Sequence, residues 1–177
     1  PGDSVTLRDP YVPGPAERAP LYYWDACAGT VSQTNPHTRE ATWVAPSEPG
    51  VYDVTVNFRN ASSTTPSRVL RLCVAKQGET ACTLSPPPAP EMRSFAATPE
   101  KITCGARCET TLASAVDAAG SEAPLSYRWQ VRRGIISGGG PTVKFEMPLV
   151  GCCPETYTAA LTVCDARHAA ATGITDV

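Results

Sequence analysis

Several features that would indicate chemistry, nucleic acid or a membrane are scarce in this chain. It has only two histidines and no C-x-x-C pair, which gives a zinc site of cysteine and histidine little support. Its 15 basic and 17 acidic residues nearly cancel, and no basic run occurs, so nucleic acid and anionic membranes are poor partners. The apolar stretches are far shorter than the ~20 residues that span a bilayer, so we expect no direct membrane insertion.

Catalytic motifs are also scarce. No G-x-S-x-G motif occurs, and the three glycines at 138–140 lack the following Lys-Ser/Thr of a phosphate-binding loop, which indicates a turn. His37 and His168 lie in loop-like segments, and we interpret both as surface residues. Asp117 and Asp165 could contribute to a calcium site, but no D-x-D-x-D ladder is present. We therefore expect a protein without a catalytic site or a cofactor, and not an enzyme.

Helical patterns are missing too. Eighteen prolines interrupt the chain, and no window shows a sustained apolar stripe at helical spacing. Short stretches instead alternate between apolar and polar residues, as in a half-buried strand. The clearest is 51–58, where Tyr52, Val54, Val56 and Phe58 share one face. Further strands are expected at 2–9, 21–24, 41–44, 69–74, 101–104, 109–113, 125–131, 142–147, 157–163 and 172–177.

One spacing occurs twice. Trp24 precedes Tyr52 by 28 residues and Trp129 precedes Tyr157 by 28, so the second pair is displaced from the first by 105 residues. A displacement this long fits a whole domain rather than a solenoid unit. We predict an all-β chain of two tandem antiparallel β-sandwiches, at 1–80 and 94–177, joined by a proline-rich linker at 81–93. The repeated tryptophans and tyrosines are expected in the two cores, and the linker is expected to make the pair rod-like.

Two segments resemble a known family. Pro46–Val56 is similar to the "P…G-x-Y-x-V-x-V" strand of polycystic-kidney-disease (PKD) repeats and related immunoglobulin-like domains, and residues 155–165 resemble its "Y-T-V-T-L-T-V-x-D" version. Residues 125–129 match the family's "Y-x-W" strand, but its usual "W-x-F-G-D-G" is absent after both Trp24 and Trp129. The resemblance implies a non-catalytic extracellular module with an Ig/PKD-like fold.

The eight cysteines are an even number, which we interpret as disulfides in an oxidising compartment. They are Cys27, Cys73, Cys82, Cys104, Cys108, Cys152, Cys153 and Cys164. A bond between Cys27 and Cys73 would clip the first sandwich and stabilise it by roughly 2–4 kcal/mol. Cys82 would then need a partner in the second unit.

The remaining pairing stays open. The adjacent Cys152 and Cys153 are expected to bond two different cysteines, with Cys104 and Cys108 as the first candidates. No free thiol is expected. A cysteine-based metal site is the rival interpretation, and eight cysteines allow about 105 connectivities.

Asn60 opens an Asn-Ala-Ser acceptor for N-glycosylation in a polar loop. The chain begins at Pro1 without methionine, and we expect a mature fragment of a longer secreted or cell-surface protein. The predicted function is a structural or adhesion spacer with protein or glycan partners at a cell surface or in a fibre. One alternative is a carbohydrate-binding module of a secreted hydrolase, for which Trp43 and Tyr11 could supply exposed aromatics; a secreted enzyme is the other.

Overall fold

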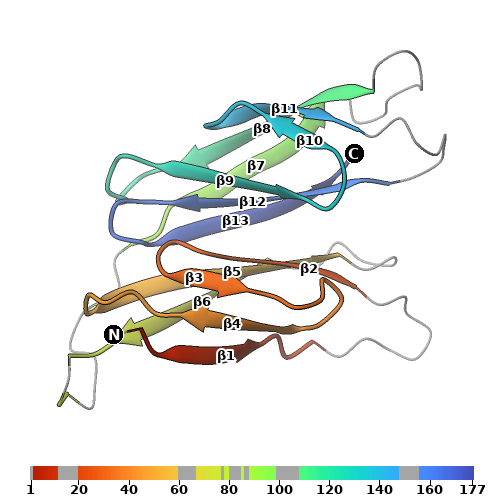
Figure 1. Ribbon diagram of the computed structural model, residues 1–177. Coiled ribbons are helices and arrows are strands. Elements are labelled where there is room, and N and C mark those ends of the chain that lie inside the picture. Colours follow the sequence, from red (N-terminus) through yellow and green to blue (C-terminus); the bar gives the residue numbers. More distant parts are fainter. Residues whose placement is uncertain are drawn as a thin grey trace.

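The computed structural model of the chain describes residues 2–11, 20–59, 67–76, 78–79, 85, 88–98, 108–147 and 156–177. Their regular structure is antiparallel β-strand, arranged in four sheets (Figure 1). No helix able to cross a membrane occurs among these residues. The prediction of an all-β chain built from antiparallel sheets is confirmed.

The first unit contains two three-stranded sheets. In each unit, the inner sheet is the one that faces the other unit, and the outer sheet is the one that faces away. Its outer sheet has the order β1-β4-β3, with β1 at Ser4–Arg8, β4 at Glu40–Val44 and β3 at Thr30–Ser32. Its inner sheet has the order β2-β5-β6, with β2 at Leu21–Ala26, β5 at Gly50–Arg59 and β6 at Arg68–Val74.

The second unit repeats this plan and adds a strand. Its outer sheet has the order β10-β11-β8-β7, with β10 at Ile135–Ser137, β11 at Thr142–Glu146, β8 at Glu109–Asp117 and β7 at Glu91–Thr98. Its inner sheet has the order β13-β12-β9, with β13 at Ala170–Asp176, β12 at Thr158–Cys164 and β9 at Ser126–Val131. β7 starts within the range that the sequence assigned to the linker, 81–93, of which residues 81–84 and 86–87 lie outside the described residues.

The displacement of 105 residues is also kept in the strand register. Trp24 pairs with Val56 across β2 and β5, and Trp129 pairs with Leu161 across β9 and β12. The turns before β3 and β10 share it as well, because Gly29 and Gly134 both have positive φ, at 76° and 92°. The two units are therefore built on one plan.

Each unit has its own apolar core. In the first, Trp24, Trp43 and Phe58 are buried between the two sheets. The Tyr52 hydroxyl donates to the carbonyl of Glu48 over 2.8 Å, an arrangement like the tyrosine corner of Ig-like sandwiches. The face of 51–58 assigned from alternation, including Val54 and Val56, is buried here as predicted.

The second core contains Leu112, Phe145 and Ala159. Trp129 and Tyr157 pack against it while staying partly exposed, and the Trp129 indole donates to the Gly140 carbonyl over 3.0 Å. The sequence prediction that both tryptophan–tyrosine pairs serve core packing therefore holds, with the second pair at the margin of its core.

The two sandwiches lie face to face, so that the four sheets form a stack (Figure 1). The inner sheets meet in its middle: β12 contacts β2 and β5, and β13 contacts β5 and β6. The sequence predicted a rod-like pair, and this was wrong. Polar side chains on the inner sheets form hydrogen bonds with each other rather than with water. These bonds hold the two units face to face.

The sequence patterns did not predict three of the strands, β3, β7 and β10. β3 and β10 have only three residues each, too few for a visible alternation, and β7 follows directly after the prolines. The predicted strand at 101–104 lies outside the described residues.

Candidate functional site at the interface of the two sandwiches

The buried interface between β5 and β12 is polar. Asp53, Thr55 and Asn57 alternate with the core residues of β5 and point the other way, toward the second unit. Thr55 Oγ1 lies 2.9 Å from Thr162 Oγ1, and Asn57 donates to Thr172 Oγ1 over 2.6 Å. Thr55, Asn57 and Thr162 are buried and Thr172 is half-buried, and both contacts join the two units.

An ion pair closes one end of this interface. The Arg59 guanidinium donates to both carboxylate oxygens of Asp176 over 2.8 Å. This hydrogen bonding raises the pKa of Arg59 above its ordinary value. Thr158 also donates to Asp176, over 3.1 Å, so the carboxylate is held both by β5 of the first unit and by β12 of its own sheet.

Side chains of β9 and of Arg132, the residue that follows it, cover the free edge of β2. Arg128 donates to the carbonyl of Ala26, Gln130 donates to that of Trp24 over 3.0 Å, and Arg132 donates to that of Tyr22. The three donors are spaced two residues apart, and so are the three acceptors. This spacing arises because alternate carbonyls of β2 point away from β5. Unpaired strand edges invite association with other chains, and the second unit protects this one.

Burial changes the proton affinities along this edge. Burial lowers the pKa of Arg132, whose guanidinium also stacks on the Tyr23 ring at 4.8 Å. Burial raises the pKa of the Tyr23 hydroxyl and of the Asp25 carboxyl. Asp25 accepts from the Ala26 amide and lies 3.3 Å from Arg128, and both contacts act against the effect of burial.

Asp53 ties the opposite end of the interface together. Its carboxylate accepts two hydrogen bonds from Arg71, at 2.8 and 3.0 Å, and one from the Ala170 amide at 2.8 Å. Its own amide donates to the carbonyl of His168 over 3.1 Å. His168 adopts φ of 67°, which turns that carbonyl toward the first unit. His168 thus serves the interface, where the sequence suggested a surface loop residue.

A disulfide crosses the interface beside Asp53. Cys27 follows β2, Cys164 ends β12, and the two are bonded with their Cα atoms 5.5 Å apart and 137 residues apart in sequence. Both cysteines are buried against Ala170. The bond fixes the two units to each other covalently.

The expected pairing of Cys27 with Cys73 was therefore wrong. β2 and β6 flank β5 in one sheet, so they are roughly 9–10 Å apart, beyond the ~7 Å limit for the Cα atoms of a disulfide. Cys73 is also disulfide-bonded. Cys108 is buried and carries a free thiol, which contradicts the expectation of none. Cys82, Cys104, Cys152 and Cys153 lie outside the described residues.

The other candidate residues stay separate from this site. His37 is exposed, and its ring nitrogen Nδ1 lies 3.1 Å from the Pro20 carbonyl. Asp117 pairs with Arg93 over 2.6 Å. Asp165 accepts from three backbone amides, those of Glu122, Arg167 and Ala169. Within the described ranges, no group of three His, Cys, Asp or Glu residues could hold a metal ion. Asn60 falls in a part that the structure does not describe.

The aromatic residues are turned inward. None of the three tryptophans, six tyrosines and three phenylalanines, all of which the structure describes, is fully exposed. Trp43 is only 2% exposed and donates to the Ala28 carbonyl, and Tyr11 packs on Phe58 with 4.7 Å between ring centres. The suggestion that Trp43 could face outward was wrong, and Tyr11 is half-buried.

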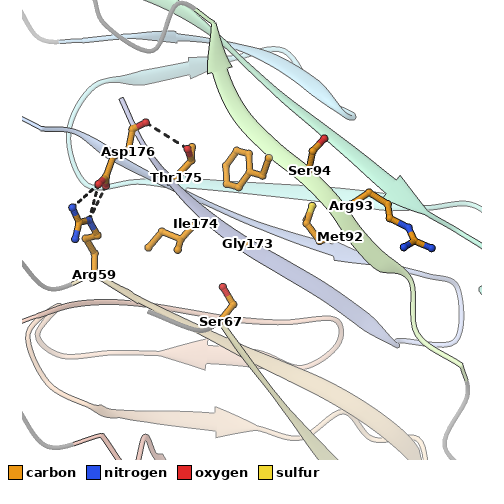
Figure 2. Close-up of a pocket in the computed structure, with 10 residues that line it drawn as sticks. Arg59, Ser67, Met92, Arg93, Ser94, Gly173, Ile174, Thr175 and Asp176 are labelled. Atoms are coloured by element: carbon orange, nitrogen blue, oxygen red, sulfur yellow. Dashed lines mark hydrogen bonds and ion pairs between the residues drawn. The ribbon is translucent and has the colours of Figure 1, made fainter. Parts of the chain in front are cut away.

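A groove opens beside the interface (Figure 2). Its volume is about 560 Å³, and its lining comes from β7, from β13 and from the facing end of the first unit. Arg59 and Asp176 close one end, with their ion pair drawn in Figure 2. Sequence reasoning gave no sign of this groove, because its lining comes from segments that are distant along the chain.

The interface itself had a signal in the sequence. The outward positions of the two central strands are 53, 55 and 57 in β5 and 160, 162 and 164 in β12, and none carries lysine or glutamate. Water-facing positions of a sheet usually carry long charged side chains, so this lack could have indicated a covered face.

No protein-family model matches the chain, and a search of curated proteins finds no similar sequence.

Proposed function

We propose that this chain is a non-catalytic structural module of an extracellular protein, which holds two PKD-like, Ig-like sandwiches as one rigid spacer in a cell-surface or fibrous glycoprotein. The observation that carries the proposal is the disulfide between Cys27 and Cys164, which crosses the interface between the units. Disulfides persist in oxidising surroundings such as the cell exterior. An adhesive role would then belong to loops and exposed sheet faces presented by a fixed scaffold.

The position of this disulfide has a mechanical consequence. It joins two residues that are 137 positions apart, which leaves 39 of the 177 residues outside the closed loop. A pulling force applied at the two chain ends is transmitted through the disulfide, so it loads β1, β2 and β13 but not the strands between Cys27 and Cys164. The module would therefore resist extension even if its strands were to melt, as a spacer under tension requires.

Single-molecule pulling from both ends tests this role. At up to about 3.6 Å per residue, the oxidised chain should lengthen by no more than about 140 Å, and the chemically reduced chain by roughly 600 Å. The double variant Cys27→Ser/Cys164→Ser should extend well beyond the oxidised chain. Cys108→Ser, which removes only the free thiol, should match the unsubstituted protein. Full extension of the oxidised chain would refute the spacer mechanism.

The glycoprotein part of the proposal has its own test. Secretion from a eukaryotic cell should give a form whose electrophoretic mobility increases after enzymatic removal of N-glycans. Asn60→Gln should abolish that shift. A secreted chain without any shift would contradict glycosylation at Asn60.

A further inference from the structure

Strand β13 has one edge bonded to β12 and one edge that faces away from it. Tyr157 and Val177 exchange both backbone hydrogen bonds, at 3.1 and 2.8 Å, and the register from there along β13 has no shift. In an antiparallel ladder, such pairs alternate with pairs whose N–H and C=O groups point outward. The backbone groups of Thr172, Ile174 and Asp176 therefore point away from β12.

The neighbouring residue on the same edge confirms this direction. The N–H group of Ala170 donates to the Asp53 carboxylate over 2.8 Å, away from β12. Beyond Ala170, no described strand pairs with this edge. The edge of β2 differs, because side chains of β9 and of the following Arg132 donate to the free carbonyls of β2.

The open edge of β13 lines the groove of Figure 2. Met92 and Phe95 of β7 form an apolar wall on one side, and Ser67 with Arg59 bounds the other. Gly173 leaves room for Phe95, since a Cβ atom at this residue would lie only 3.1 Å from the Phe95 ring. The volume of about 560 Å³ lies in the range of ligand sites in proteins.

We propose that this groove binds an extended peptide, which adds to the open edge of β13 as a further strand. Outward-pointing backbone donors and acceptors at every second residue recognise an extended backbone. Of the outward groups of β13, the Asp176 carbonyl already accepts from the Thr175 hydroxyl over 3.5 Å. The devices that usually block an edge, proline and lysine, do not occur in β13. The groove also continues the interface between the sandwiches, since it ends on its Arg59–Asp176 ion pair.

The walls specify the kind of peptide. Because the groove is bounded on two sides, it accepts a single strand rather than the edge of a second sheet. Successive side chains of a bound strand point to opposite walls. Alternate positions should therefore be apolar, against Met92 and Phe95, and the others small and polar, against Ser67.

Peptide titration of the full oxidised chain tests the proposal. The probe is a seven-residue synthetic peptide of alternating threonine and valine with a lysine at each end. We expect saturable binding, with hydrogen exchange of the Ile174 amide slowed at least tenfold in the complex. A version of the peptide in which every threonine and valine is N-methylated, so that neither of its edges can donate to a strand, should bind at least tenfold more weakly.

Variants locate the site. Ile174→Pro removes one edge N–H and should abolish binding. Val69→Pro is the matched control, because residue 69 holds the equivalent place on the open edge of β6, 105 residues earlier, and it should bind normally. Equal binding of the methylated peptide, unchanged exchange at Ile174, or equal loss in both variants would overturn the proposal. This test does not depend on the spacer role, because the disulfide is intact in every arm.

Discussion

The hydroxyl groups of Thr55 and Thr162 lie 2.9 Å apart at the centre of the interface, although 107 residues separate them in the sequence. Each occupies the outward face of the central strand of its sandwich, where a lone domain would meet water. Both side chains are almost completely buried. Their contact shows that the two sandwiches bury polar faces against each other, between two separate apolar cores.

A double-mutant cycle measures this contact. Thr55→Val or Thr162→Val alone leaves the other hydroxyl buried without this partner, which should lower the free energy of unfolding by about 1–3 kcal/mol. The double variant should lose less than the sum of the two, with a coupling of about 0.5–1.5 kcal/mol. Urea unfolding of the four proteins measures the cycle. Strict additivity would mean that the units do not meet at this pair.

The pH dependence of stability should contain a contribution from Asp25. Burial raises its pKa in the folded state above the ordinary 3.8, so the folded protein holds this proton more tightly than the unfolded chain. From about the unfolded pKa upward through the folded pKa, the free energy of unfolding therefore falls as the pH rises.

Asp25→Asn should remove that dependence. Its unfolding free energy should fall less steeply between about pH 4 and pH 7 than that of the unsubstituted chain. Asp3→Asn, at an exposed position, is the control for a simple change in charge. Denaturant midpoints across this range give the comparison, and parallel curves for Asp25→Asn and the unsubstituted protein would contradict the assigned burial.

Protection of the β2 edge should depend on Arg132. Arg132→Ala removes a donor to the Tyr22 carbonyl and the stacking on Tyr23, which should lower stability by about 1–3 kcal/mol. It also opens part of an edge strand, so concentration-dependent self-association is expected in analytical ultracentrifugation. Lys144→Ala, which removes an exposed positive charge, should stay monomeric. Identical behaviour of the two variants would argue against the capped edge.

The repeated glycine turns should be intolerant of any side chain. A Cβ atom at Gly29 would lie 2.3 Å from the Val44 carbonyl oxygen, and one at Gly134 would lie 2.6 Å from that of Glu146. With positive φ as well, Gly29→Ala and Gly134→Ala should each cost more than about 1 kcal/mol of unfolding free energy. Gly139→Ala meets no atom within 4 Å and should be nearly neutral. Thermal unfolding of all three variants compares them.

Local patterns in the sequence were sufficient for the sandwiches but not for their arrangement. The alternation of Tyr52, Val54, Val56 and Phe58 identified the core face of β5 correctly, because burial on one side imposes a period of two. The same pattern marks the opposite face only as polar, and it cannot tell water from a polar partner. The stacking of the two sandwiches therefore could not be predicted from this pattern.

The cysteine pairing failed for a related reason. Cys27 and Cys73 were assigned to one bond because they lie in one unit, yet β5 runs between their strands. Pairing depends on which strands are neighbours in space, and that became visible only when the sheet order was known. Likewise, the groove beside β13 is formed by segments from both units, so no local motif announces it.

Disulfide mapping tests the central claim most directly. The oxidised chain, with its free thiol blocked, should be digested without reduction and analysed by mass spectrometry. We expect a linked pair of peptides that contain Cys27 and Cys164, which only the stacked arrangement of the two sandwiches brings together. A linked pair containing Cys27 and Cys73 would contradict the stack.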